Sequence, residues 1–285
     1  MENCEDLLSP FYAALSSELS SNSLNFPTSF NLLKRALAIM DNPNSMIKDY
    51  ATLVQSEPIL LAKVLRMANS VAMNPYGREV TGAFEAVQRL GSKKIRCLVY
   101  LVVMEQVRQD NRSEELKRLA NILWKHSVDV ACLSYAFAKR TGICEPDEAM
   151  LSGIMIDIGQ FFIISRIPAY PEILSNTTCM TELIKNSHIS VAKQIIDTMK
   201  LPRVVIDVYN CNLKLHPVWP MLEIADVITL SSICTNFRNP FLQTVDDLKK
   251  QAFYEELTNN DTDSLERMLD DIDPMKTEMF NSMCM

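Results

Sequence analysis

The sequence predicts an all-α protein. Apolar residues recur at helical spacing along most of the 285 residues, and convincing period-two alternation, which is typical of half-buried strands, is absent. All six glycines lie between Gly77 and Gly159, so the last 126 residues contain none. The sequence has no glycine-rich phosphate-binding motif of the dinucleotide or P-loop type, which argues against the α/β nucleotide-binding folds.

The composition is that of a globular protein with a large core. Hydrophobic residues make up 48% and charged residues 22% of the chain. The longest apolar run, Cys97 to Met104, is far shorter than the roughly 20 residues of a membrane-spanning helix, so no membrane segment is expected. The 8 cysteines form no C-x-x-C pair and no signal peptide is visible, which indicates reduced thiols and a cytoplasmic location.

Charge is concentrated at the C-terminal end. Residues 245–285 contain 11 acidic and 4 basic side chains, a net charge of −7 that equals the net charge of the whole chain. Residues 1–244 are therefore neutral, which is a poor electrostatic footprint for DNA or RNA. We expect no nucleic-acid partner, and we interpret the acidic end as a solvated surface or as a partner-binding segment.

The first third of the sequence reads as a series of short helices. Helical spacing and turn signals place them at residues 4–20, 31–40, 45–54 and 58–69. Ser45 is expected to cap the third of these helices. Pro58 suits the first turn of the fourth, where its missing N–H costs nothing, and Asn69-Ser70 should end it.

Asn69 is predicted to be a buried structural clamp. It precedes a loop that runs to Val80 with only Pro75 and Gly77 to shape it. Such a loop needs its backbone polar groups satisfied, and one asparagine side chain offers both a donor and an acceptor. The alternative is an exposed Asn69 that contacts a signal or a partner.

A possible anion site lies at the start of the next long helix. Residues 81–90 should form a short helix that Gly91 ends, and Ser92 should cap the helix that follows. Lys93 and Lys94 lie in the first turn of that helix, beside backbone N–H groups that favour anions. The alternative is two solvated lysines.

The central stretch, residues 149–164, is almost wholly apolar and contains one carboxylate, Asp157. We expect a core helix with Asp157 at its end. Since ionised carboxylates are almost never fully buried without a partner, we predict that Asp157 is buried and paired. Gly153 and Gly159 flank it, and glycine is tolerated in a helix where another backbone must approach closely.

Helices are also expected on both sides of the central stretch. A long helix at residues 114–140, with Thr141-Gly142 as its stop, carries His126, which is either a core histidine or a ligand. Further helices are expected at residues 189–199, with His188 near the start, and around Asp226. From about Val245 the pattern is polar, so we expect two or three peripheral helices and a frayed, methionine-rich terminus.

Four stretches resemble the HDOD domain, an output module of bacterial signalling proteins that is related to HD-type metal phosphohydrolases. They are SEPILLAKVLRMANS (residues 56–70), EAVQRLG (85–91), LWKHS (123–127) and GIMIDIG (153–159). The resemblance covers roughly residues 24–235, with an N-terminal helical half at 24–111 and an HD-like half at 112–235. It implies an HD-like helical domain preceded by a small N-terminal helical bundle, with an N-terminal helix at 1–23 and an acidic helical extension at 236–285.

The resemblance also implies where a metal site would lie. HD phosphohydrolases hold metal with a His, a His-Asp pair and a later Asp, and His126, Asp157 and Asp226 match these positions. His188 matches a further His of some relatives. The pair reads Ile156-Asp157, so its His is gone, and another paired His of the family is also missing. We interpret these residues as a vestigial site or ligand pocket, without metal, cofactor or catalytic residue.

The expected function is a non-catalytic regulatory module of a bacterial signalling pathway that binds a protein partner or a small ligand. The alternative is a residual metal-dependent phosphohydrolase that acts on nucleotides or cyclic dinucleotides. Asp157 is expected to pair with His126, Arg66 or Lys125. His216 precedes a proline and is expected to be exposed. The oligomeric state is left open.

Overall fold

The computed structural model describes most of the chain, and every regular element in the described part is a helix, which confirms the all-α prediction. The described residues are 4–20, 30–109, 113–198, 201–210, 217–242, 254–259 and 262–284. His216 lies outside these residues.

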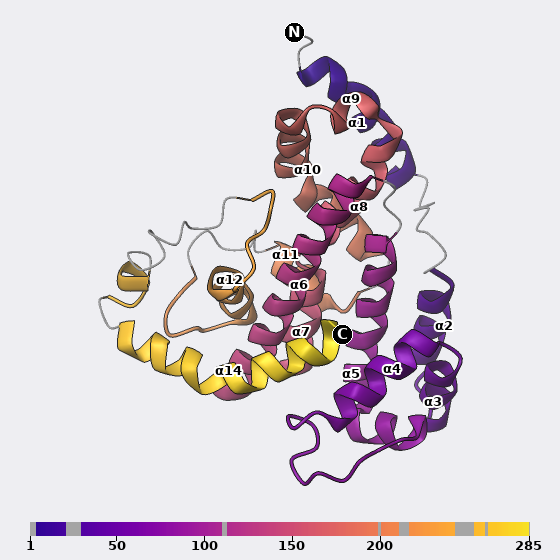
Figure 1. The fold of residues 1–285 in the computed structure, drawn as a ribbon, viewed down its shortest axis with the longest axis vertical. Helices are drawn as coiled ribbons and strands as arrows, with labels where there is room; N and C mark the ends of the chain where they lie inside the picture. Colours follow the sequence, from indigo (N-terminus) through magenta and orange to yellow (C-terminus); the bar gives the residue numbers. More distant parts are fainter. Residues whose placement is uncertain are drawn as a thin grey trace.

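Five helices form the N-terminal part: α1 (Cys4–Ser20), α2 (Phe30–Met40), α3 (Ile47–Gln55), α4 (Pro58–Asn69) and α5 (Ala83–Gln109). Pro58 lies in the first turn of α4, as predicted. Helices α2, α3 and α4 pack against α5 (Figure 1). Gly91 has a positive φ of 76° and interrupts the helical backbone inside α5, at the point where the sequence predicts a boundary between two helices.

The start of α3 differs from the prediction. Its N-cap is Met46, whose backbone N–H donates to the Asp49 carboxylate at 2.8 Å. Ser45 does not cap the helix, because its hydroxyl donates to the Ile39 carbonyl at 2.6 Å. An acidic residue at the third helical position can reach back to this free N–H, so Asp49 takes over the role expected of Ser45.

The loop after α4 is held in place by Asn69. Its Nδ2 donates to the Val80 carbonyl at 2.7 Å, and its Oδ1 accepts the Val80 N–H at 2.8 Å. Arg89 adds hydrogen bonds to the carbonyls of Ala68 at 2.9 Å and Arg78 at 3.0 Å. Asn69 is half-buried rather than buried. These are the contacts expected of a clamp, and its contribution to stability stays a prediction.

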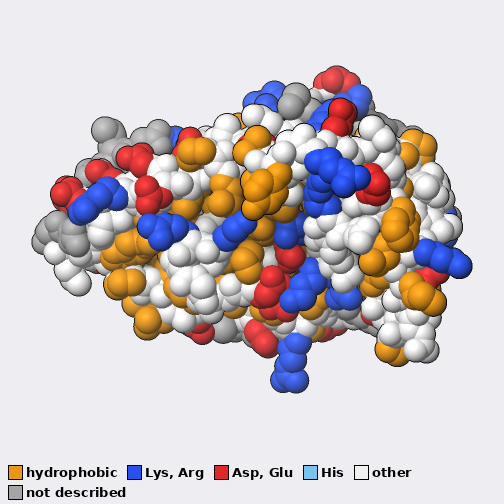
Figure 2. Space-filling model, turned by 90° about the horizontal axis from the view of Figure 1, so that it is seen from below, with side chains coloured by type: hydrophobic (Ala, Val, Ile, Leu, Met, Phe, Trp, Pro, Cys, Tyr) orange, Lys and Arg blue, Asp and Glu red, His pale blue; other side chains and the backbone are white. Residues whose placement is uncertain are grey.

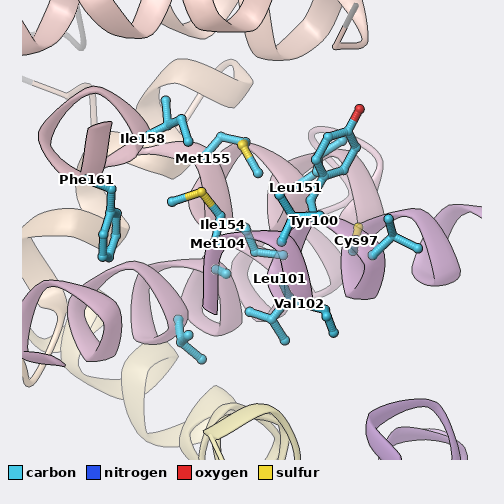
Figure 3. Packing of buried hydrophobic residues seen from close by; sticks show 14 of the residues in the cluster. Cys97, Tyr100, Leu101, Val102, Met104, Leu151, Ile154, Met155, Ile158 and Phe161 are labelled. Atoms are coloured by element: carbon cyan, nitrogen blue, oxygen red, sulfur yellow. The ribbon is translucent and has the colours of Figure 1, made fainter. Parts of the chain in front are cut away.

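Three helices lie at the centre of the molecule: α6 (Glu114–Thr141), α7 (Pro146–Met155) and α8 (Ile158–Arg166). Helix α6 ends at Gly142, whose φ of 72° is left-handed, as the predicted stop requires. Helix α7 packs along α6 and against α5. Figure 3 shows the contact with α5, where Leu101 and Met104 lie close to Ile154 of α7.

The segment Pro146–Ala169 is long and apolar enough to cross a membrane, by length and composition. In the structure it comprises α7, α8 and the short 3₁₀ helix η1 (Ile167–Ala169), and 89% of its most apolar 18 residues is buried inside the protein. A helix that is apolar on all sides is either a membrane span or the core of a large domain. Because the rest of the chain buries α7 and α8, they have the arrangement of core helices in this structure.

The second half continues with α9 (Pro171–Leu174), α10 (Thr177–Thr198), α11 (Arg203–Asn210) and α12 (Ile224–Cys234). Helix α10 begins at Thr177 instead of residue 189, because the intervening residues include neither Pro nor Gly and extend the helix. His188 therefore lies well inside α10 rather than near its start. Helix α10 packs on α8, and α12 packs on α6.

The C-terminal helix α14 (Thr262–Cys284) corrects the prediction of a frayed end. It packs on α6 and α4, and Met279 and Met283 are fully buried (Figure 1, yellow). The Lys63 ammonium of α4 donates to the Met283 carbonyl at 2.5 Å, and Lys276 pairs with Asp129 of α6 at 2.9 Å. Five of the six acidic residues of the helix are exposed, whereas the Glu278 carboxylate accepts the backbone N–H groups of Val71 and Ala72 after α4. The polar composition of the helix therefore does not reveal the apolar face that docks on the core.

The cysteines differ in part from the prediction of reduced thiols. Five described cysteines are free: Cys97, Cys132, Cys144, Cys234 and Cys284. Cys179 is disulfide-bonded, and its partner lies outside the residues whose side chains the structure describes. The prediction is therefore wrong for Cys179, because the fold can bring together cysteines that no local spacing connects.

Candidate functional site: a buried polar cluster around Asp157

Asp157 lies in a break between two core helices. The central stretch is not one helix: α7 ends at Met155, α8 begins at Ile158, and Asp157 has the non-helical angles φ −107° and ψ 13°. The Tyr209 hydroxyl lies 2.6 Å from the carbonyl oxygens of both Met155 and Ile156, to which it donates. Burial, and then the charge of Asp157, raises the pKa of Tyr209 far above its usual value, so this hydroxyl keeps its proton.

Both carboxylate oxygens of Asp157 are engaged by other side chains. Oδ2 lies 2.7 Å from His126 Nδ1 and accepts the Ser127 hydroxyl at 2.6 Å. Oδ1 accepts the side-chain amides of Gln160 at 3.1 Å and Asn239 at 3.0 Å. Asp157 is only 2% exposed. The predicted burial is observed, and of the three expected partners, His126, Arg66 and Lys125, the structure shows His126. Four donors together satisfy the carboxylate.

Three of these four donors were missed by the sequence analysis. Ser127 ends one matched stretch, next to His126 in the chain, and Gln160 directly follows another. Gln160 lies three positions after Asp157, a spacing that makes side chains neighbours on a helix. Asn239 follows α12 and is 82 positions away from Asp157 along the chain. No local pattern marks it, because its position depends on how the segment after α12 crosses the core.

Two close helix contacts position the break, and both use the glycines that the sequence analysis singled out. A Cβ on Gly153 would lie 2.6 Å from the Ala131 Cα of α6. A Cβ on Gly159 would collide with the His188 carbonyl of α10. Only glycine lets these backbones approach so closely, so α7 and α8 are held against α6 and α10 on either side of Asp157.

Asp226 has a different task from the one that the resemblance implies. It is fully buried near the start of α12, where Oδ1 accepts the Val218 N–H at 3.1 Å. Oδ2 accepts the backbone N–H groups of Leu222 at 3.1 Å and Glu223 at 3.2 Å. These bonds satisfy free N–H groups at a helix start. Among the described residues, the Asp226 carboxylate is thus bonded to its own loop and not to Asp157.

His188 is also engaged locally. Its Nδ1 lies 2.9 Å from the Ile184 carbonyl and 3.1 Å from the Lys185 carbonyl, one turn earlier in α10. Its backbone faces Gly159, so α10 touches the central break through its main chain. Of the four residues predicted to share a pocket, the structure joins only His126 and Asp157 by a side-chain contact.

The two lysines predicted as an anion site are paired with carboxylates of the same chain. Lys93 lies 2.7 Å from Glu145, and the hydrogen bond raises the pKa of Lys93. Lys94 lies 2.7 Å from Asp147. Burial lowers the pKa of Lys94, but the hydrogen bond and the charge of Asp147 raise it above its usual value. This pairing argues against the predicted anion site, because each ammonium already has its counter-ion.

The residues around Asp157 do not fit a catalytic metal centre. Such a centre needs about three well-placed ligands and an open position. His126 Nδ1 and both Asp157 oxygens are already bonded within the protein, and Ile156, in place of a His ligand, packs in an apolar cluster with Val130 and Val208. The described residues contain no group of three or more His, Cys, Asp or Glu side chains arranged to hold a metal ion.

Comparison with known proteins agrees with the resemblance seen in the sequence. The model of the HDOD domain family matches residues 26–213. The chain belongs to the HDOD domain family. Among curated proteins, none is significantly similar in sequence to this HDOD protein. The expected domain limits at residues 24 and 235, and the division between 111 and 112, stay predictions.

Several solved structures share this HDOD fold. A protein from Shewanella amazonensis SB2B, provisionally named a metal-dependent phosphohydrolase, is 18% identical with a TM-score of 0.72, covering 96% of this chain and 99% of its own. An HDOD domain protein of unknown function from Geobacter sulfurreducens is also 18% identical, with a TM-score of 0.64 and coverages of 95% and 98%. A provisionally named signal transduction protein from Marinobacter aquaeolei VT8, 18% identical, has a TM-score of 0.57 and coverages of 96% and 66%.

Proposed function

We propose that this HDOD protein is a non-catalytic regulatory module that acts in signalling by binding a protein partner or a small ligand. The observation that carries the proposal is the closed hydrogen-bond set of Asp157, in which His126, Ser127, Gln160 and Asn239 occupy both carboxylate oxygens. A carboxylate in this state stabilises the core and is not free to bind an ion or a substrate.

Hydrolysis of a phosphoester by a metal-bound water would require a different arrangement. The metal must be held tightly and must keep positions open for water and substrate. Here a metal at Asp157 would have to displace four donors from a carboxylate that is only 2% exposed. Each hydrogen bond to a charged group contributes about 1.5–3 kcal/mol, so their combined loss would offset much of the gain from a metal bond.

The surroundings in which the module would act are part of the same proposal. The name of the Marinobacter relative supports a signalling role, and the organisms of the solved relatives support a bacterial origin. On the face shown in Figure 2, acidic and basic side chains of the described residues are intermingled, which supports a protein or small-ligand partner over a nucleic acid. Five free thiols support a cytoplasmic location, whereas the disulfide of Cys179 does not.

The test is an assay for phosphodiester hydrolysis by the full chain with added Mn²⁺. The proposal predicts no turnover above the rate without protein. The matched control is Asp157→Asn, which keeps the size of the side chain but removes its charge. If the wild type hydrolyses the phosphodiester and the substitution abolishes this turnover, the proposal is contradicted. That result would support the alternative of a residual phosphohydrolase, which agrees with the name of the Shewanella relative.

A further inference from the structure

A cavity of about 280 Å³ lies between the two halves of the molecule, separate from the cluster around Asp157. Helices α2 and α3 contribute Met40 and Tyr50 on one side. Helix α7 contributes Glu148 and Leu151 on the other, and Arg96 of α5 lies between them. The volume is close to the lower limit of about 300 Å³ for small-ligand pockets, so it suits a small molecule.

The charges in this cavity are only partly compensated by the protein. Lys93 and Asp147 also line it, but each is paired, with Glu145 and Lys94 respectively. The side chains of Arg96 and Glu148, which are both half-buried, form no ion pair or hydrogen bond within the described residues. One cation and one carboxylate thus line the same cavity beyond ion-pair distance of each other.

Apart from the small polar residue Ser92, the rest of the wall is largely apolar. Met40, Leu151 and Pro202 contribute aliphatic surface, and Tyr50 contributes an aromatic ring. The thiol of Cys97 adds to this surface, because burial raises its pKa well above the usual value and keeps it neutral. A ligand that fits this wall therefore has an apolar body, in addition to groups that meet the two charges.

We propose that this cavity binds a small zwitterion with an apolar body, of the chemical class of the free aliphatic α-amino acids. The ligand carboxylate meets the guanidinium of Arg96, which can donate two parallel hydrogen bonds to it. The ligand ammonium meets the carboxylate of Glu148. An amino acid carries these opposite charges on two groups bonded to the same carbon atom as its aliphatic side chain, which is the combination that the wall offers.

Such a ligand would connect the two halves of the protein. Its apolar body would contact α2 and α3, while its charged groups would be held by α5 and α7. Binding would therefore favour arrangements in which these helices lie together, and a ligand shifts an equilibrium by its difference in affinity for the two states. This inference rests on the proposed regulatory function, for which it names a ligand class and a site.

The test is isothermal titration of the full chain with three probes that share one aliphatic body. They are L-leucine, 4-methylpentanoic acid, which lacks the ammonium group, and 3-methylbutylamine, which lacks the carboxylate. Wild-type protein is expected to bind L-leucine, and each analogue at least roughly tenfold more weakly, since each loses one charge-assisted contact. No measurable binding of L-leucine, or equal binding of the acid, overturns the proposal.

Two substitutions assign the charges. Arg96→Gln should weaken L-leucine binding by roughly tenfold or more and leave the affinity for 3-methylbutylamine unchanged. Glu148→Gln should weaken L-leucine binding by a similar factor and leave the affinity for 4-methylpentanoic acid unchanged. The matched controls are Arg118→Gln and Glu115→Gln, at exposed positions of α6 outside the cavity. Equal loss in the controls would overturn the assignment. Absence of L-leucine binding leaves the non-catalytic function standing, because only phosphodiester turnover contradicts that.

Discussion

Asp157 lies at the sequence position of a family metal ligand, but its carboxylate is hydrogen-bonded inside the core of this protein. Where the resemblance implies a His ligand, the chain has Ile156, which packs in an apolar cluster, and donors of the same chain engage the Asp157 carboxylate. Gln160 and Asn239 bond to one oxygen, and His126 is held by the other. The carboxylate thereby connects α6, α8 and the segment after α12.

Asn69 is expected to stabilise the loop after α4 through its two hydrogen bonds to the Val80 backbone. Asn69→Ala should lower the free energy of unfolding by about 1–3 kcal/mol, because the N–H and carbonyl of the buried Val80 would lose their partners. Asn69→Leu should cost more, since it adds bulk without restoring a hydrogen bond. Urea denaturation of the three proteins measures the difference. An alanine variant that unfolds like the wild type but no longer binds a partner would instead favour a recognition role.

At the scale of elements, the contact between α8 and α10 depends on the absence of a Cβ atom at Gly159. Gly159→Ala would place a methyl group against the His188 carbonyl, and the two helices would have to separate. Overpacking of this kind costs about 1–3 kcal/mol, so the midpoint of thermal unfolding should fall by several degrees.

The control for this contact is Gly82→Ala, a glycine with open space around its Cβ position. Its effect should stay below about 1 kcal/mol, because it can change only the capping at the start of α5. If both variants unfold at the wild-type temperature, then the close approach of α8 and α10 does not contribute to stability.

The elements also show which features a sequence can predict. Local signals, such as Pro58 in a first turn and Gly142 after a last one, mark helix ends because they act through the backbone of one residue. The sequence predicts a helix that ends at Asp157, but no local signal predicts that α8 begins directly after it, because Tyr209 supports this break from α11. Likewise, the acidic composition of α14 does not reveal that its inner face docks on α4 and α6, which depends on distant residues such as Lys63.

At the scale of the whole molecule, the resemblance to HDOD proteins predicted the family and named His126 as one of three expected partners of Asp157. It did not predict that Asp226 and His188 would be engaged by their own loop and helix. Side chains that match a family motif in sequence can acquire new local partners, and only the assembled fold shows which of them still meet. The cavity beside Arg96 could not be predicted from the sequence either, because segments from distant parts of the chain line it.

The central claim is that Asp157 belongs to a closed structural cluster and not to a metal site. Its most direct test is the free energy of unfolding of wild type and Asp157→Asn, with and without Mn²⁺, with the exposed Asp270→Asn as control. We expect Asp157→Asn to lose about 1.5–3 kcal/mol and Mn²⁺ to have no effect on any of the three proteins. A ligand that binds only the folded state stabilises it, so stabilisation of the wild type by Mn²⁺ that Asp157→Asn abolishes would contradict the claim.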